Sequence, residues 1–206
     1  MLKAFVSDFG YQNSDSYIFG TPMFGGNNDR GFRITTHVDN TFGIAAGGNS
    51  NIVYTYSANK LVNVWYDIAM VLDQSQDIIF LYVDGVLESQ VSISQIGTIN
   101  NNYNLNIGAF ENVSWMGNFF SGSVDKISIW NTVLTQQEIQ SYMNCPPTGN
   151  ESGLVGYWNF EEGEGETVID LSGNGNDGII NGATYSSDIP EHSCQLINSN
   201  GCDSIA

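Results

Sequence analysis

Positive charge is scarce in this sequence of 206 residues. It contains 5 lysine and arginine residues against 22 aspartate and glutamate residues, and its formal net charge at pH 7 is −17. A chain with this charge is repelled by the phosphates of nucleic acids and of anionic membranes. We therefore expect no nucleic acid as a partner and no insertion into a membrane. The acidity favours solubility, and it also supplies carboxylates that can bind cations.

Long apolar runs are absent as well. No stretch is long enough to span a bilayer, and residues 1–11 lack the basic segment and continuous apolar core of a signal peptide. Strong helical periodicity is almost missing, whereas glycine is abundant, with 23 residues. Short strands joined by turns have this composition. The sequence predicts one all-β domain, an antiparallel sandwich of two sheets.

Alternating apolar residues mark the strands along the chain. The tight turn at Asp84 and Gly85 predicts a hairpin between two of them. One helix is expected near residues 135–143, where Thr135 and Glu138 have the spacing of a capping box. The expected strands cover residues 2–6, 17–19, 31–37, 41–46, 52–56, 64–72, 78–83, 86–91, 104–108, 119–130 and 154–160.

Residues 153–185 form the most distinctive stretch. We interpret the rest of the chain as the main body of the domain, which this stretch completes. The stretch begins with the aromatic strand GLVGYWNF, continues through the acidic glycine turn EEGEGE and reaches the loop DLSGNGNDG, residues 170–178. Aspartate, asparagine and glycine supply oxygen ligands for calcium. The same residues also form hydrogen-bonded turns without a metal, so both interpretations stay open.

This stretch resembles the opening hairpin of the laminin-G-like, concanavalin A-like jelly-roll domains, a group that includes the pentraxins. The segments LYVDG at 81–85 and FFSGSVDKISIW at 119–130 resemble later strands of the same family. The resemblance implies a jelly-roll sandwich in which Trp65 and Tyr82 fill the core between the sheets. It also implies that Asp125 approaches the loop of the hairpin.

The order of these segments is permuted, because the family's first hairpin stands last in this chain. We expect one domain over residues 1–186, with a core at 1–144 and a closing hairpin at 153–185, followed by a tail or linker at 187–206. A sandwich without its first strands would expose two sheet edges, and for this reason we favour closure within the chain. The alternative is a hairpin that belongs to the next module or is swapped into a second copy.

The resemblance and the loop together predict a structural calcium site. A carboxylate in an apolar strand costs several kcal/mol unless it is paired or bound to a metal, and Asp125 interrupts such a strand. The predicted ligands come from this strand and from the loop, and they are Asp125, Asp170, Gly173, Asn174 and Asn176.

Three cysteines stand in the last third of the chain. A bridge between Cys145 and Cys194 would join the two ends of the closing hairpin and would fit an exported protein. A bridge between Cys194 and Cys202 is the competing pairing.

The predicted function is that of a non-catalytic, calcium-stabilised adhesion or recognition module in a larger secreted or cell-surface protein. Its partner would be a glycan or an extracellular protein, and Tyr11, Tyr103 and Trp115 are the candidate contact residues. The alternatives are a polysaccharide hydrolase or lyase on the same fold, and a structural spacer. The sequence lacks the paired carboxylates on one strand that a retaining glycosidase needs. His37 and His192 are expected to be structural.

Overall fold

The computed structural model describes residues 1–10, 15–23, 30–49, 51–112, 115–190, 196–197 and 203–204. The chain divides into two compact units. We call Ala4–Ser123 the sandwich unit, and Met1–Lys3 together with Val124–Ala206 the C-terminal unit. Each unit is described by itself below.

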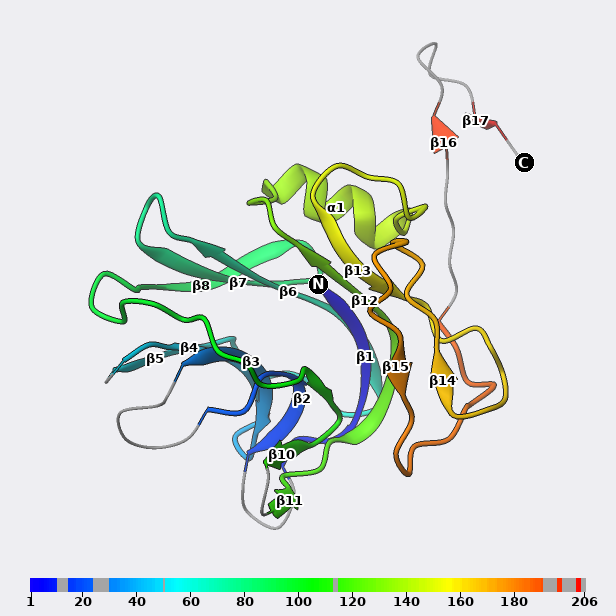
Figure 1. The fold of residues 1–206 in the computed structure, drawn as a ribbon, viewed down its shortest axis with the longest axis horizontal. Helices are drawn as coiled ribbons and strands as arrows, with labels where there is room; N and C mark the ends of the chain where they lie inside the picture. Colours follow the sequence, from blue (N-terminus) through cyan, green and yellow to red (C-terminus); the bar gives the residue numbers. More distant parts are fainter. Residues whose placement is uncertain are drawn as a thin grey trace. The chain divides into compact units, whose positions relative to one another are not determined.

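Strands are the predominant regular secondary structure of the described residues (Figure 1). The strands are β1 (Leu2–Asp8), β2 (Ser16–Gly20), β3 (Gly31–His37), β4 (Thr41–Gly47), β5 (Ile52–Tyr56), β6 (Val64–Asp73), β7 (Ile78–Val83), β8 (Val86–Ser92), β9 (Asn106–Ile107), β10 (Phe110–Asn112), β11 (Trp115–Gly117), β12 (Ser121–Trp130), β13 (Leu154–Trp158), β14 (Thr167–Val168), β15 (Gly178–Ile179), β16 (Leu196–Ile197) and β17 (Asp203–Ser204). One helix, α1, covers Gln136–Asn144.

The sandwich unit consists of two facing antiparallel sheets. One has the strand order β5-β4-β3-β2-β9, and the other contains β1, β6, β7 and β8 in that order (Figure 1). Phe42 of β4 joins the layers, since its ring lies 5.2 Å from the rings of both Phe9 and Tyr66. Burying such rings is the main source of stability in a sandwich. The predicted all-β sandwich is confirmed.

The hairpin of β7 and β8 turns at Asp84 and Gly85, as the sequence predicts. Both residues have positive φ, 49° and 71°, and a two-residue hairpin turn of this kind needs that conformation at both positions. The prediction that Trp65 and Tyr82 fill the core between the sheets is wrong. Tyr66 is 7% exposed, whereas Trp65 and Tyr82 are half-buried. Strand alternation gives the inner positions on β7 to Ile79, Leu81 and Val83, which are 0–2% exposed.

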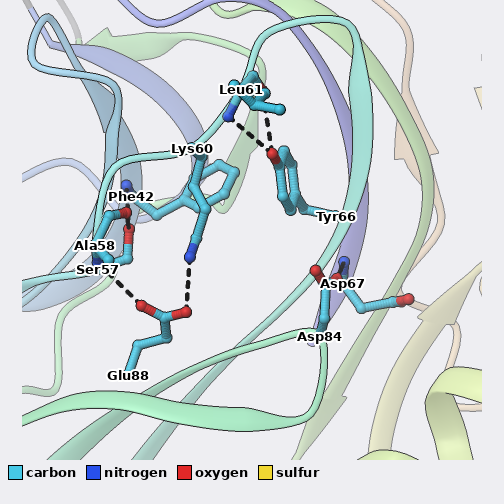
Figure 2. A network of polar contacts seen from close by, with 9 residues as sticks. All are labelled: Phe42, Ser57, Ala58, Lys60, Leu61, Tyr66, Asp67, Asp84 and Glu88. Atoms are coloured by element: carbon cyan, nitrogen blue, oxygen red, sulfur yellow. Dashed lines mark hydrogen bonds and ion pairs between the residues drawn. The ribbon is translucent and has the colours of Figure 1, made fainter.

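The loop that follows β5 is held by Glu88 of β8 (Figure 2). The Glu88 carboxylate accepts hydrogen bonds from the Ala58 amide at 3.0 Å and from the Lys60 ammonium at 2.6 Å. Beside it, Ser57 Oγ accepts from the Phe42 amide at 2.9 Å. The end of β5 is therefore fastened both to β4 and to the opposite sheet.

In the C-terminal unit, β13 pairs with the second half of β12, with Tyr157 opposite Ser128. The predicted helix is confirmed as α1, with N-cap Thr135 and Glu138 forming the expected capping box. Lys126 is buried, and its ammonium donates to the Met143 carbonyl at 2.9 Å, near the end of α1. Among the described residues, no helix has the length and apolar character needed to cross a membrane. The division into a domain at 1–186 and a tail stays a prediction.

We expect Glu88→Ala to lower the free energy of unfolding by about 1–3 kcal/mol, because it leaves the Ala58 amide and the Lys60 ammonium without their acceptor. Denaturant unfolding monitored by circular dichroism measures the change. Gln90→Ala, an exposed position on the same strand, is the matched control. Equal stability of the two variants would contradict the role given to Glu88.

Candidate functional site

The face of the five-stranded sheet that points away from the sandwich core carries an unusual set of side chains. Along β4, Phe42, Ile44 and Ala46 are buried in the core, so Gly43 and Ala45 belong to the outer face. In the register of the sheet, Ala45 stands between Arg33 of β3 and Tyr54 of β5. Likewise, Gly43 stands between Thr35 and Tyr56. Long side chains of β3 and β5 thus flank the small residues of β4.

Two pairs of side chains bridge β4 on this face. The Arg33 guanidinium donates to the Tyr54 hydroxyl at 3.5 Å and lies 5.5 Å from the centre of that ring. The rings of His37 and Tyr56 meet edge to face, with their centres 4.7 Å apart. A Cβ atom at Gly43 would lie 2.4 Å from His37 Nε2, so any larger residue there would displace the imidazole. We call Arg33, His37, Tyr54 and Tyr56 the outer platform.

His37 is fixed by a hydrogen-bond network that the sequence did not suggest. Its Nδ1 lies 2.5 Å from the Asp15 carboxylate, and its Nε2 lies 3.0 Å from the Thr35 hydroxyl. In the tautomer that donates from Nδ1 to Asp15, Nε2 accepts from Thr35. Burial lowers the pKa of the imidazole below its ordinary value of 6.5, while the carboxylates of Asp15 and Asp39 act against burial. The network fixes the orientation of the His37 imidazole, which packs edge to face with the Tyr56 ring.

The predicted metal loop of the C-terminal unit is organised around Asp170, which is 6% exposed. Its Oδ1 accepts from the amides of Tyr157 and Ser172, both at 3.0 Å. Its Oδ2 accepts from the Asn176 amide at 2.9 Å and from Asn176 Nδ2 at 3.2 Å. Burial acts to raise the pKa of Asp170, but the hydrogen bonds from Ser172, Tyr157 and Asn176 outweigh it and lower the pKa to about 2.

The other loop residues tie the loop to β13. Asn174 Nδ2 donates to the carbonyls of Leu154 and Val155 at 3.2 and 3.1 Å, and Asn176 Nδ2 donates to the Val155 carbonyl at 2.9 Å. Gly173 and Gly175 have φ values of +75° and +76°, which glycine adopts without strain. The loop thus closes on the strand through its amide groups.

Asp125 and Asp170 both act on Tyr157, in different ways. Asp170 accepts from its backbone amide, whereas Asp125 acts on its side chain. Burial, with a smaller contribution from the Asp125 carboxylate, raises the pKa of the Tyr157 hydroxyl to about 12. Both predicted ligands therefore influence the same tyrosine.

As arranged, these residues do not fit a calcium ion held by Asp170. Each oxygen of that carboxylate already accepts two N–H groups, and a carboxylate offers about two acceptor sites per oxygen. Over the described ranges, no group of three His, Cys, Asp or Glu side chains could hold a metal ion. The calcium ion stays a prediction, which melting curves with and without calcium test.

Of the three contact residues predicted from the sequence, the structure describes the side chain of Tyr103, which is not part of the outer platform. Tyr103 is 42% exposed and precedes β9, at the sheet edge opposite β5. Trp115 belongs to β11, but its side chain, like Tyr11, lies outside what the structure describes. Cys194 also lies outside the described residues, so the pairing with Cys145 stays a prediction.

We expect Asp170→Asn to lower the free energy of unfolding at pH 7 by about 3 kcal/mol, because it weakens several charge-assisted hydrogen bonds. Denaturant unfolding in excess chelator measures this, with the exposed Asp188→Asn as control. The wild-type advantage is complete above the ordinary pKa of 3.8 and is lost as the pH falls through about 2. Unchanged stability of Asp170→Asn at pH 7 would refute the role of Asp170.

His37 should titrate below 6.5, and Asp15→Asn should lower its pKa further by removing the carboxylate that stabilises the imidazolium. Since the pKa of His37 is lower in the folded protein than in the unfolded chain, the unfolded chain binds a proton at His37 more tightly. The stability of the wild-type protein therefore decreases as the pH falls below 6.5. NMR titration of the imidazole signals measures both effects, with His192 as the second histidine of the chain. A rise in the pKa of His37 in Asp15→Asn would contradict this account.

Comparison with known proteins places this geometry in context. The chain is 25% identical over 181 residues to the rat (Rattus norvegicus) sushi, von Willebrand factor type A, EGF and pentraxin domain-containing protein 1. This match covers 83% of the chain and only 5% of the length of that relative.

Two solved structures resemble the chain in fold. A proposed carbohydrate-binding protein from Bacteroides ovatus has a TM-score of 0.66 and 18% identity, over 85% of this chain and 50% of that one. The heptameric SAP-like pentraxin of Limulus polyphemus has a TM-score of 0.56 and 15% identity, over 87% of this chain and 81% of that one. Identity at this level shows a common fold and nothing finer.

A laminin G-type family model of the concanavalin A-like lectin/glucanases superfamily matches residues 6–140, well over half of the chain. This match confirms the resemblance carried by the sequence motifs. The chain belongs to the laminin G-type family of the concanavalin A-like lectin/glucanases superfamily.

Proposed function

We propose that this chain is a non-catalytic glycan-binding module of a larger exported protein, and that it binds sugars on the outer platform. The observation that carries the proposal is the pair of adjacent tyrosines on β5. Tyr54 and Tyr56 are 41% and 45% exposed, and both belong to the outer face of a regular sheet. Exposed aromatic rings grouped on one face are typical of a binding surface.

The surroundings of the tyrosines suit a sugar. A sugar ring has an apolar face that packs on an aromatic ring and hydroxyl groups at its edge that need hydrogen-bond partners. Tyr54 and Tyr56 offer ring faces, and Arg33 and His37 stand beside them with polar groups. The platform is preorganised, because Asp15 and Thr35 fix His37, so little side-chain entropy is lost on binding.

The remaining support is of two kinds. The Bacteroides ovatus protein of similar fold is itself a proposed carbohydrate-binding protein. The rat relative is a protein of several named domain types in which a segment of this size is one small part. Two described carboxylates act on the platform residue His37: Asp15 is paired with His37, and Asp39 accepts from the Thr41 hydroxyl. Neither is arranged with the other as the opposed acid and base or nucleophile that glycoside hydrolysis requires.

We expect Tyr54→Ala and Tyr56→Ala each to weaken binding of the best ligand on a glycan array by about tenfold or more, because truncating an aromatic anchor costs at least about 1.4 kcal/mol. Tyr103→Ala is the matched control, since this tyrosine is equally exposed, at 42%, but lies toward the other sheet edge. The proposal fails if no glycan binds, or if only Tyr103→Ala weakens binding.

A further inference from the structure

Resting on the proposed function, we infer that the outer platform selects sugars that carry a single anionic group, a carboxylate or a sulfate, and that Arg33 is the residue that recognises it. The inference concerns the charge of the ligand, which the tyrosines alone do not determine. It is carried by the surroundings of Arg33 within an otherwise acidic chain.

Cations in this chain are few, and in the sandwich unit Lys60 and Arg33 have different roles. Lys60 forms an ion pair with Glu88 at 2.6 Å, and the side chains of this pair are only 14% and 18% exposed. Arg33 instead contacts neutral groups, namely the Tyr54 hydroxyl and the rings of Tyr17 and Tyr54. No carboxylate in the described part of the chain lies within ion-pair distance of Arg33.

The position of the guanidinium favours a ligand as its partner. Arg33 is half-buried and belongs to the same outer face as the two exposed tyrosines. The rings of Tyr17 and Tyr54, whose centres lie 5.6 and 5.5 Å from its Cζ atom, hold it in place. A guanidinium fixed in this way keeps N–H donors for the planar, two-pronged recognition of an oxyacid group.

The net charge of the chain limits how acidic the ligand can be. At −17, the protein repels a polyanion at long range, and Asp15 and Asp39 stand near His37 at one end of the platform. One guanidinium offsets one anionic group at short range. We therefore expect a sugar with an isolated acidic group to bind better than either a neutral sugar or a densely charged polysaccharide.

The test is a glycan array printed with matched triplets that differ only at the terminal residue, a hexose, the corresponding hexuronate and the hexose 6-sulfate, together with heparin as a polyanion. Wild type should bind one acidic member about tenfold more tightly than the hexose, and Arg33→Gln should bring the ratio of the two affinities to about one. The acidic member that is preferred identifies the group. Arg33→Lys should retain part of the preference, because it keeps the charge without the planar fork.

The two proposals fail in different ways. If wild type binds the three members equally, or binds heparin best, the inference about charge is wrong and glycan binding on the platform stands. If no triplet binds and Tyr54→Ala changes nothing, the proposed function itself is wrong. Circular dichroism and melting temperature establish that each variant is folded. Should Arg33→Gln fail to fold, the preference measured with wild type and with Arg33→Lys decides the inference.

Discussion

The alternation of large and small side chains along β4 is the constraint on which the rest of the structure depends. Its inner residues include Phe42, which contacts rings of the opposite layer, and its outer residues, Gly43 and Ala45, have almost no side chain. β4 thereby packs large side chains into the core and, with small residues on its outer face, leaves space there for the side chains of β3 and β5. Side chains of β3 and β5 contact each other over β4, so the same alternation that stabilises the sandwich creates the outer platform.

In the C-terminal unit the Asp170 carboxylate accepts hydrogen bonds from its own loop and from β13, whereas the calcium ion that the motif indicates stays a prediction. Asp170 gathers the amides of β13 and of its own loop around one buried charge, much as a bound anion organises a backbone nest. In this arrangement the positive ends of N–H dipoles surround the negative charge of Asp170. A loop rich in aspartate, asparagine and glycine can therefore be stable through hydrogen bonds alone.

Local signals predicted most of the fold, and the failures have physical causes. The alternation of apolar residues predicted the observed bounds of β3, β5 and β7, and the spacing of Thr135 and Glu138 predicted the N-terminus of α1. Trp65 was wrongly assigned to the core because Tyr66 follows it. When two adjacent residues of a strand are both aromatic, the sequence does not show which of them faces the core. Asp170 was ambiguous because calcium and amide groups demand the same oxygen atoms. The outer platform was missed because Arg33 and Tyr54 meet only through sheet register.

The central claim is that sugars bind to the outer face of β3, β4 and β5. The most direct measurement is an NMR titration of isotope-labelled protein with the tightest oligosaccharide from the array, which follows the tyrosine ring signals and the Arg33 side-chain N–H groups. The account predicts that the largest and saturable shifts occur at Tyr54, Tyr56 and Arg33. It is contradicted if the largest shifts occur at residues 170–177 or around Tyr103 while Tyr54 and Tyr56 stay unchanged.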